Sequence, residues 1–281
     1  MDRMKILVTG ATGTVGGHVA RQLSGRGHDI VALVRDPAKA DLPADVSLIE
    51  GDLTDPDAVR RALDGVDRAY LTMADDNGAV FAKMAGEAGV EHVVLLSSFT
   101  AVTELPSGAA NFVTARHRAG ERALTEAGVP ATFLRAAGFD YNILLWVAGA
   151  ADGVVRAPNA GVKLPVVDPA DIAAAAVAAL TAAHPKSGAY SITGPESLSV
   201  RDQIAIVNQV LGRSYTVQEV GEAEAPGSLP PSILETMGPA AAVVTPADGV
   251  RVLTGNPPRP FAAWVADNAR AFPPAGLTAD R

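Results

Sequence analysis

Short apolar runs alternate with amphipathic segments along the first half of the 281-residue chain. The run Ile6–Val8 ends at Gly10, and a segment with Val15, Val19 and Leu23 on one face follows directly. This change of period predicts a strand, a tight turn and a helix. The same reading predicts further strands and helices. The strands are at 30–34, 46–50, 66–72, 93–96 and 131–135, and the helices are at 55–63 (N-cap Thr54), 79–88 and 112–127.

Beyond about residue 150 the alternation becomes looser, because prolines and glycines interrupt it. We expect helices at 171–182 and 200–211, a strand at 189–192, short helices and loops over 221–260, and a last helix near 261–272. Either Asp168 or Asp171 is expected to cap the first of these helices. Strands separated by helices of this length imply right-handed crossovers. The sequence therefore predicts an α/β fold: a doubly wound parallel-sheet Rossmann domain (1–150) and a smaller α/β C-terminal substrate lobe (151–281), some elements of which return to the main sheet.

Composition narrows the class of protein. Hydrophobic residues make up 48% and charged residues 19%, as in globular proteins, and the net charge of −8 without a basic block argues against nucleic acid as a partner. The absence of cysteine excludes disulfides, thiolate metal sites and a cysteine nucleophile. The apolar stretches 143–151 and 172–180 are too short to cross a bilayer, and the first strand begins too early for a signal peptide. We therefore expect a cytoplasmic protein with no membrane contact, either a monomer or a homodimer.

Glycines at 10, 13 and 16 form the most informative motif of the chain. Gly10 and Gly13 allow a sharp turn close to a diphosphate, and Gly16 allows the helix to lie against the strand. The helix start then offers free N–H groups to phosphate oxygens. This position, directly between a strand and a helix, predicts a dinucleotide site.

Arg35, which ends the second predicted strand, indicates which dinucleotide is bound. A carboxylate at this point would bind the ribose 2′-hydroxyl of NAD, whereas arginine suits the 2′-phosphate of NADP. Lys39 is a second candidate for that phosphate. Asp36 weakens the inference, although an aspartate before Pro37 also starts turns. We expect NADP(H).

Several stretches together resemble the NmrA-like branch of the atypical short-chain dehydrogenase/reductases. They are 8–16, 33–37, 50–55, 96–98, 134–142, 167–173 and 253–261. The resemblance extends to quinone reductases and to reductases of secondary metabolites. It implies that Thr12, Gly13, Thr14 and Val15 bind the diphosphate and that Asp52 and Leu53 flank the adenine. It also implies that Thr72, Met73 and Ala74 line the path of the ribose and nicotinamide, and that Ala136, Gly138 and Phe139 lie beside the carboxamide. A turn-forming role is the alternative for Asp52.

The catalytic residues are less clear, because the helix after the fifth strand lacks the Tyr-x-x-x-Lys of the wider superfamily. His117 occupies the position that relatives give to lysine or histidine, where a cation holds ribose hydroxyls or an imidazole donates a proton. A surface histidine pairing with Glu121 is the alternative. Ser97 and Ser98 contact the nicotinamide or the substrate, or only cap a loop. Tyr141 is a candidate proton donor facing the cleft, or a packed side chain.

These residues predict hydride transfer from NADPH to a small conjugated, apolar acceptor such as a quinone, enone, imine or carbonyl compound. The C-terminal lobe is expected to supply an apolar wall from Phe139, Tyr141, Leu145, Trp146 and residues of 221–245. No histidine grouping suggests a metal. Two alternatives stay open: a non-catalytic NADP(H) sensor, and a redox-neutral isomerase or cyclase on the same fold.

Overall fold

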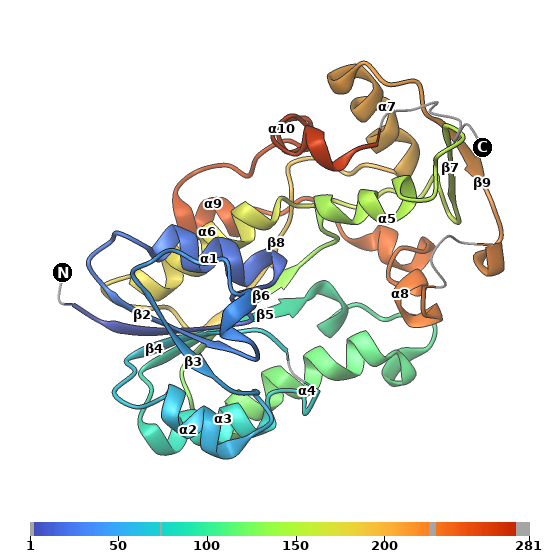
Figure 1. The fold of residues 1–281 in the computed structure, drawn as a ribbon. Helices are drawn as coiled ribbons and strands as arrows, with labels where there is room; N and C mark the ends of the chain where they lie inside the picture. The colour runs from blue at the N-terminus through green and yellow to red at the C-terminus, as the bar shows by residue number, and fades with distance from the viewer. Residues whose placement is uncertain (1–2, 74, 225–228, 274–281) are drawn as a thin grey trace.

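A seven-stranded parallel sheet forms the centre of the protein, as a computed structural model that describes residues 3–73, 75–224 and 229–273 shows (Figure 1). Its strand order is β3-β2-β1-β4-β5-β6-β8. The strands are β1 (Lys5–Thr9), β2 (Asp29–Val34), β3 (Val46–Glu50), β4 (Arg68–Leu71), β5 (His92–Ser98), β6 (Ala131–Ala136) and β8 (Gly188–Ile192). The predicted doubly wound Rossmann fold is confirmed.

Helices cover both faces of this sheet (Figure 1). One face carries α1 (Thr14–Leu23), α6 (Pro169–Thr181) and α9 (Gly249–Thr254), and the other carries α2 (Pro56–Ala62), α3 (Ala79–Ala88) and α4 (Phe112–Glu126). The apolar run of β1 explains the two layers. Ile6 and Val8 join the core under α1 and α6, whereas Leu7 points to the core on the other side. A strand that is buried on both faces needs such a continuous apolar run.

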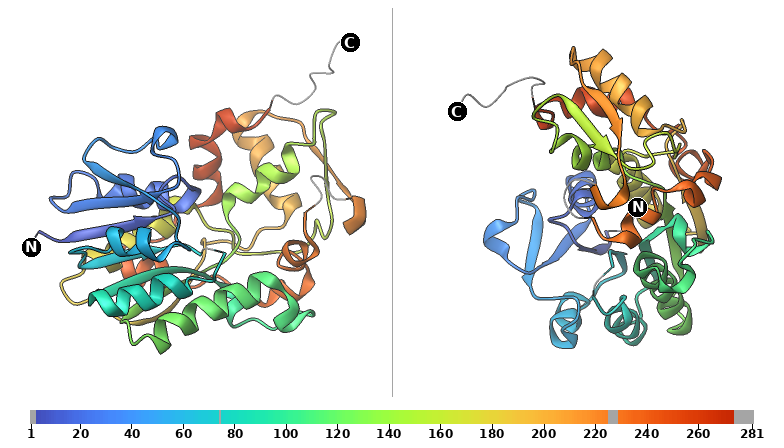
Figure 2. Two further views of the ribbon diagram at one scale, coloured as in Figure 1. Left: turned by 60° about the horizontal axis from the view of Figure 1, so that its bottom comes forward. Right: turned by 90° about the vertical axis from the view of Figure 1, so that its right-hand side faces the viewer.

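A second, smaller lobe stands beyond the carboxyl ends of the strands (Figure 2). It contains the parallel pair of β7 (Val154–Ala157) and β9 (Thr216–Glu219), with α5 (Ile143–Val147), α7 (Val200–Leu211), α8 (Pro231–Glu235) and α10 (Phe261–Asp267). Its core includes Trp146, Ile204 and Trp264. Neither short strand was predicted, and the helix expected over 261–272 is shorter, with a 3-10 turn at Ala269–Ala271.

The two halves of the chain are interleaved. β8, from the second half, pairs with β6 at the edge of the main sheet, and α6 packs against α1. Polar contacts help to join the lobes: Arg259 of the second lobe pairs with Asp168, 2.9 Å away, and its backbone N–H donates to Asp171.

The helix caps decide where two of the predicted helices begin. Asp168 accepts from the N–H of Ala170 and caps α6, as one of the two expected aspartates. The prediction of Thr54 as a cap is wrong, because α2 begins at Pro56 and the carboxylate of Asp55 accepts from the N–H of Asp57. Among the helices that the structure describes, none has the length and apolar character needed to cross a membrane.

Candidate cofactor and substrate site

The glycine loop between β1 and α1 leaves no room for a Cβ at two of its glycines. Gly10 has a φ of +60°, and a Cβ there would lie 2.4 Å from Cγ2 of Thr72. A Cβ on Gly16 would lie 2.2 Å from the carbonyl oxygen of Gly10. Gly13 caps α1 without any side-chain hydrogen bond, so the first N–H groups of the helix are available to an anion. Thr14 is exposed at this helix start, whereas the side chain of Val15 is buried in the core and leaves only its backbone for a ligand.

A polar cavity of about 280 Å³ opens beside this loop, at the ends of β1 to β4. It is lined by Gly10, Thr12, Leu33, Val34, Arg35, Gly51, Asp52, Leu53, Thr72, Met73, Asp75 and Arg116. Seven of the residues predicted to bind the cofactor are thus brought together from four loops. Ala74 lies outside the described residues.

Charged groups that follow β2 and β3 differ in their availability to a ligand. Arg35 is exposed, whereas the ammonium of Lys39 lies 2.8 Å from the carboxylate of Asp36. Asp36 also accepts from the N–H of Ala38, which is the turn-forming role considered for it. Asp52 accepts from the N–H and the hydroxyl of Thr54 through the single oxygen Oδ1, which lowers the pKa of its carboxyl. The turn-forming role of Asp52 is therefore real, and its second oxygen stays available.

A larger, mostly apolar cavity of about 520 Å³ follows at the ends of β5 and β6, between the two lobes. We call it the apolar cavity. Its lining consists of Thr72, Met73, Leu96, Ser97, Ser98, Phe99, Val113, Arg116, His117, Ala136, Ala137, Gly138, Phe139, Asn142, Leu145, Leu229, Ile233, Thr236 and Met237. Thr72, Met73 and Arg116 line both cavities, so the two meet at these residues. None of the described residues around the apolar cavity is an aspartate or a glutamate.

Tyr141 does not take the place predicted for it. Its side chain is 47% exposed and does not line the apolar cavity, whereas Asn142 in the same 3-10 turn (Asp140–Asn142) does. Leu145 lies in the expected wall, but Trp146 lines a neighbouring inner cavity instead. Because adjacent residues of a tight turn point in different directions, sequence position alone gave the wrong member of the turn.

His117 lies in the apolar cavity, but as a neutral group. Burial, together with the neighbouring Arg116, lowers the pKa of its imidazole to about 4, while Glu121 opposes the shift. Its Nδ1 is buried without a hydrogen-bond partner among the described residues. The lowered pKa therefore favours a neutral imidazole over a cation at this position near neutral pH. The alternative pairing with Glu121 is also absent from the described contacts of His117.

Glu121 instead joins two strand ends. Its carboxylate accepts two hydrogen bonds from Arg135 of β6, at 2.9 and 2.6 Å, and one of 2.6 Å from the hydroxyl of Ser97 of β5. The hydroxyl proton of Ser97 is therefore donated to Glu121, and Ser97 can act towards a ligand only as a hydrogen-bond acceptor. Ser98 accepts from the N–H and hydroxyl of Thr100, so it caps a turn while lining the cavity.

Arg116 is the functional candidate that the sequence reading missed. Its Nη2 donates to the carbonyl of Met73 at 2.6 Å, and its Nε is buried without a partner among the described residues. A signal existed in the sequence, since Arg116 directly precedes His117 on the same helix. Nothing local showed that both would reach the cleft.

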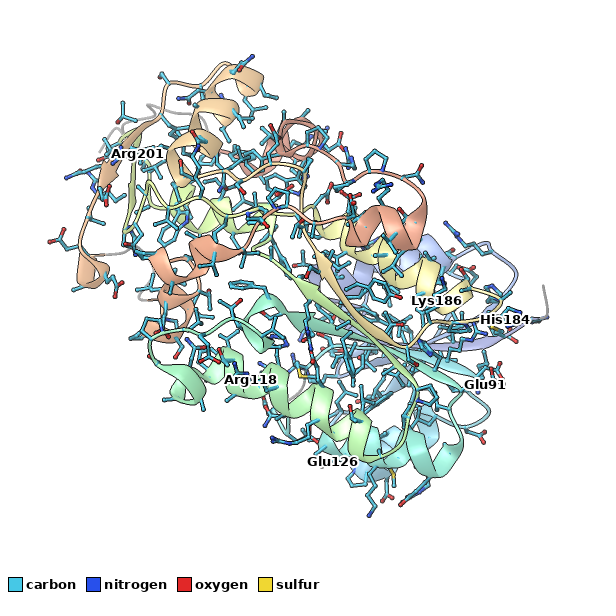
Figure 3. All side chains as sticks on the ribbon, turned by 180° about the vertical axis from the view of Figure 1, so that it is seen from behind. Glu91, Arg118, Glu126, His184, Lys186 and Arg201 are labelled. Atoms are coloured by element: carbon cyan, nitrogen blue, oxygen red, sulfur yellow. The ribbon has the colours of Figure 1, made fainter. Side chains whose placement is uncertain are left out.

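No metal centre is built into the described part of the chain, where no group of three histidines, cysteines or carboxylates converges. His184, for example, lies at the end of the molecule remote from the second lobe (Figure 3). The candidate site therefore consists of the glycine loop and the two cavities.

Comparison with known proteins agrees with this architecture. The NmrA-like family matches residues 2–247. A (4-alkanoyl-5-oxo-2,5-dihydrofuran-3-yl)methyl phosphate reductase of Streptomyces griseus is 40% identical over 96% of this chain and 99% of its own length. An NAD(P)H azoreductase of Xenophilus azovorans is 31% identical over 95% of this chain and 99% of its own length. The crystal structure of an NADPH-dependent quinone oxidoreductase of Escherichia coli superposes with a TM-score of 0.78 at 25% identity, covering 94% of this chain and 99% of that one. The family predicted from the motifs is confirmed: the chain belongs to the NmrA-like family.

Proposed function

We propose that this chain is an NADPH-dependent reductase that transfers a hydride to a small conjugated acceptor, such as a quinone, an enone, an imine or a carbonyl compound. One observation carries the proposal: a polar cavity beside the glycine loop meets a mostly apolar cavity at Thr72, Met73 and Arg116. A dinucleotide that starts at the loop has its reactive end at this junction. The full-length relatives of Streptomyces griseus and Xenophilus azovorans are both reductases.

The residues present fit a phosphorylated dinucleotide. The loop has no space for a Cβ at Gly10 or Gly16, and the uncapped start of α1 offers N–H groups to a diphosphate. Arg35 is the exposed guanidinium at the end of β2, where an adenosine 2′-phosphate is recognised in this architecture. Lys39 pairs with Asp36, so the choice of NADP over NAD rests mainly on Arg35.

The chain's own residues orient the reactants and exclude water. Bound NADPH supplies the hydride from C4 of its nicotinamide. Leu96, Phe139 and Leu145 provide apolar walls that hold a flat acceptor and keep the hydride from water. Ser97 accepts a hydrogen bond from a carboxamide or ribose donor, since its own proton is held by Glu121. Neutral His117 donates an N–H to an acceptor oxygen or to a ribose hydroxyl, and the proton that completes the reduction comes from water.

Calorimetry and a turnover assay test the function together. We expect NADPH to bind more tightly than NADH, and its oxidation to accelerate with at least one class among quinones, enones, imines and aldehydes. Gly13→Val is the matched control, because it damages the loop and spares the acceptor cavity. Tight NADPH binding with no oxidation by any class would instead make the chain a sensor. Rearrangement of a substrate without net oxidation would make it an isomerase.

A further inference from the structure

An inner cavity lies in the second lobe, directly behind the apolar cavity. Ile143 and Trp146 of α5 contribute to its wall, and α5 runs between α7 and α8 (Figure 1). The complete lining is Phe99, Gly138, Asn142, Ile143, Trp146, Pro158, Asn159, Val162, Leu164, Val166, Leu198, Val200, Gln203, Thr236 and Met237. Most of these side chains are apolar, and none of them carries a charge.

The inner cavity and the apolar cavity share one wall. Phe99, Gly138, Asn142, Thr236 and Met237 line both spaces. Gly138 contributes no side chain to this wall, and the unbranched thioether of Met237 can change its rotamer easily. The hydroxyl of Thr236 donates its proton to the carbonyl of Ile233, so it does not need a hydrogen-bond acceptor on the ligand. A group attached to a molecule in the apolar cavity therefore passes through the shared wall without meeting a charge.

The size and chemistry of the inner cavity select its occupant. The volume of the inner cavity is about 60 Å³. One water-sized group occupies roughly 10–15 Å³ of a cavity. The inner cavity therefore holds about four to six methylene-sized groups. Protein cores are close-packed, and an unfilled apolar cavity forfeits contact energy on every wall. Filling it with an apolar group from the substrate recovers that energy.

We propose that the inner cavity binds an unbranched alkyl chain of about four carbons carried by the acceptor. The inference rests on the proposed reductase function and names its substrate class: a conjugated carbonyl head group with an aliphatic tail. The tail enters through the shared wall and lies among apolar residues such as Trp146 and Val162, and it thereby fixes the orientation of the head group in the apolar cavity.

Binding of saturated ketones tests the cavity without any turnover. Dissociation constants of straight-chain 2-alkanones, from butanone to decanone, are measured by calorimetry in the absence of cofactor. We expect affinity to rise about fourfold for each added methylene until the cavity is filled, and then to level off. An affinity that does not depend on chain length overturns the proposal.

A filled-cavity variant locates the effect. Val162 is half-buried and lines only the inner cavity, so Val162→Phe occupies its space with little risk to the fold. We expect this variant to bind butanone as the unmodified chain does and to lose the chain-length dependence. Val252→Phe, at a position that is 64% exposed, is the control and keeps the dependence. Should Val162→Phe keep it as well, the tail binds elsewhere and the proposal is wrong.

Turnover separates this inference from the reductase function. In a series of 2-alkyl-1,4-benzoquinones or alkyl vinyl ketones, kcat/KM for NADPH oxidation is expected to follow the same rise and plateau. A kcat/KM that does not depend on chain length overturns the proposed alkyl site but remains consistent with the reductase function. Chain-length-dependent binding with no turnover of any acceptor overturns the reductase function instead.

Discussion

Asp140 is a buried carboxyl group whose ionisation should make the protein less stable as the pH rises. Its side chain is 1% exposed, and neither carboxyl oxygen has a hydrogen-bond partner among the described residues. Burial, reinforced by Asp168, Asp171 and Glu196 and only partly opposed by Arg259, raises the pKa of the Asp140 carboxyl from 3.8 to about 8. Between these two values the folded protein keeps a proton that the unfolded chain has released.

The sign and size of the effect follow from proton linkage. Below pH 4 both states are protonated, and Asp140 contributes no pH dependence. As the pH rises towards 8, the free energy of unfolding falls by about 1.4 kcal/mol per pH unit. At pH 7 the accumulated loss is about 4 kcal/mol. Asp140→Asn removes this titrating group, so the unfolding free energy of the variant should not show this decrease with pH.

Urea unfolding at pH 5.5, 6.5 and 7.5 measures the slope directly. We expect the difference in unfolding free energy between Asp140→Asn and the unmodified protein to grow in favour of the variant by about 3 kcal/mol across this range. The slope is the readout, because any misfit of the new amide shifts all three values equally. Asp45→Asn is the control: this exposed carboxylate accepts from Ser24 and Gly25, and those contacts lower its pKa. Its removal should shift stability without changing the slope above pH 5. Parallel curves for Asp140→Asn and the unmodified protein would refute the reasoning.

Three further predictions concern the site. Arg35→Ala should weaken NADPH binding by roughly 1.5–3 kcal/mol, the range for a hydrogen bond to a charged group, and leave NADH binding nearly unchanged; equal losses in calorimetry would contradict the assignment. Gly13→Val should abolish dinucleotide binding while circular dichroism shows an intact fold, because a Cβ there already lies 3.2 Å from the carbonyl oxygen of Gly10; unchanged affinity would speak against the loop. His117→Ala should lower turnover by about 2- to 12-fold, the effect of losing one neutral hydrogen bond, with the same pH profile between 6 and 8 as the unmodified protein. Loss of a limb from that profile would show that His117 donates a proton.

The main sheet could be predicted from sequence because its signals are local. The central strands β1, β2 and β5 contain continuous apolar runs, and helices such as α1 and α7 show a helical period of apolar residues. The pair β7 and β9 could not be found this way. Its strands have four residues each, lie some sixty residues apart and include exposed polar positions such as Gln218 and Glu219. Only tertiary packing defines them. The oligomeric state, monomer or homodimer, stays a prediction.

The residues expected at the cofactor end gather in the polar cavity, for a related reason. Arg35 and Asp52 come directly after strands, where open α/β sheets bind ligands, so their place at this edge of the sheet follows from topology. The acceptor cavity depends instead on which side chains of a helix or turn point inward. Glu121, the partner of His117 in the alternative reading, instead binds Arg135 and so joins helix α4 to strand β6. Such long-range ion pairs, and the burial that neutralises His117, arise only when the chain has folded.

The place of β8 at the edge of the sheet has a consequence for synthesis on the ribosome. A nascent chain that has emerged as far as residue 150 already contains six of the seven strands, β1 to β6. It still lacks β8, so β6 exposes an unpaired edge, and it lacks α6, so the face of α1 formed by Val19 and Leu23 has no cover. Open edges and apolar faces of this kind invite aggregation. The main sheet is therefore completed only after β8, which ends at Ile192, has been synthesised. A fragment that ends at residue 150 should be recovered as insoluble protein.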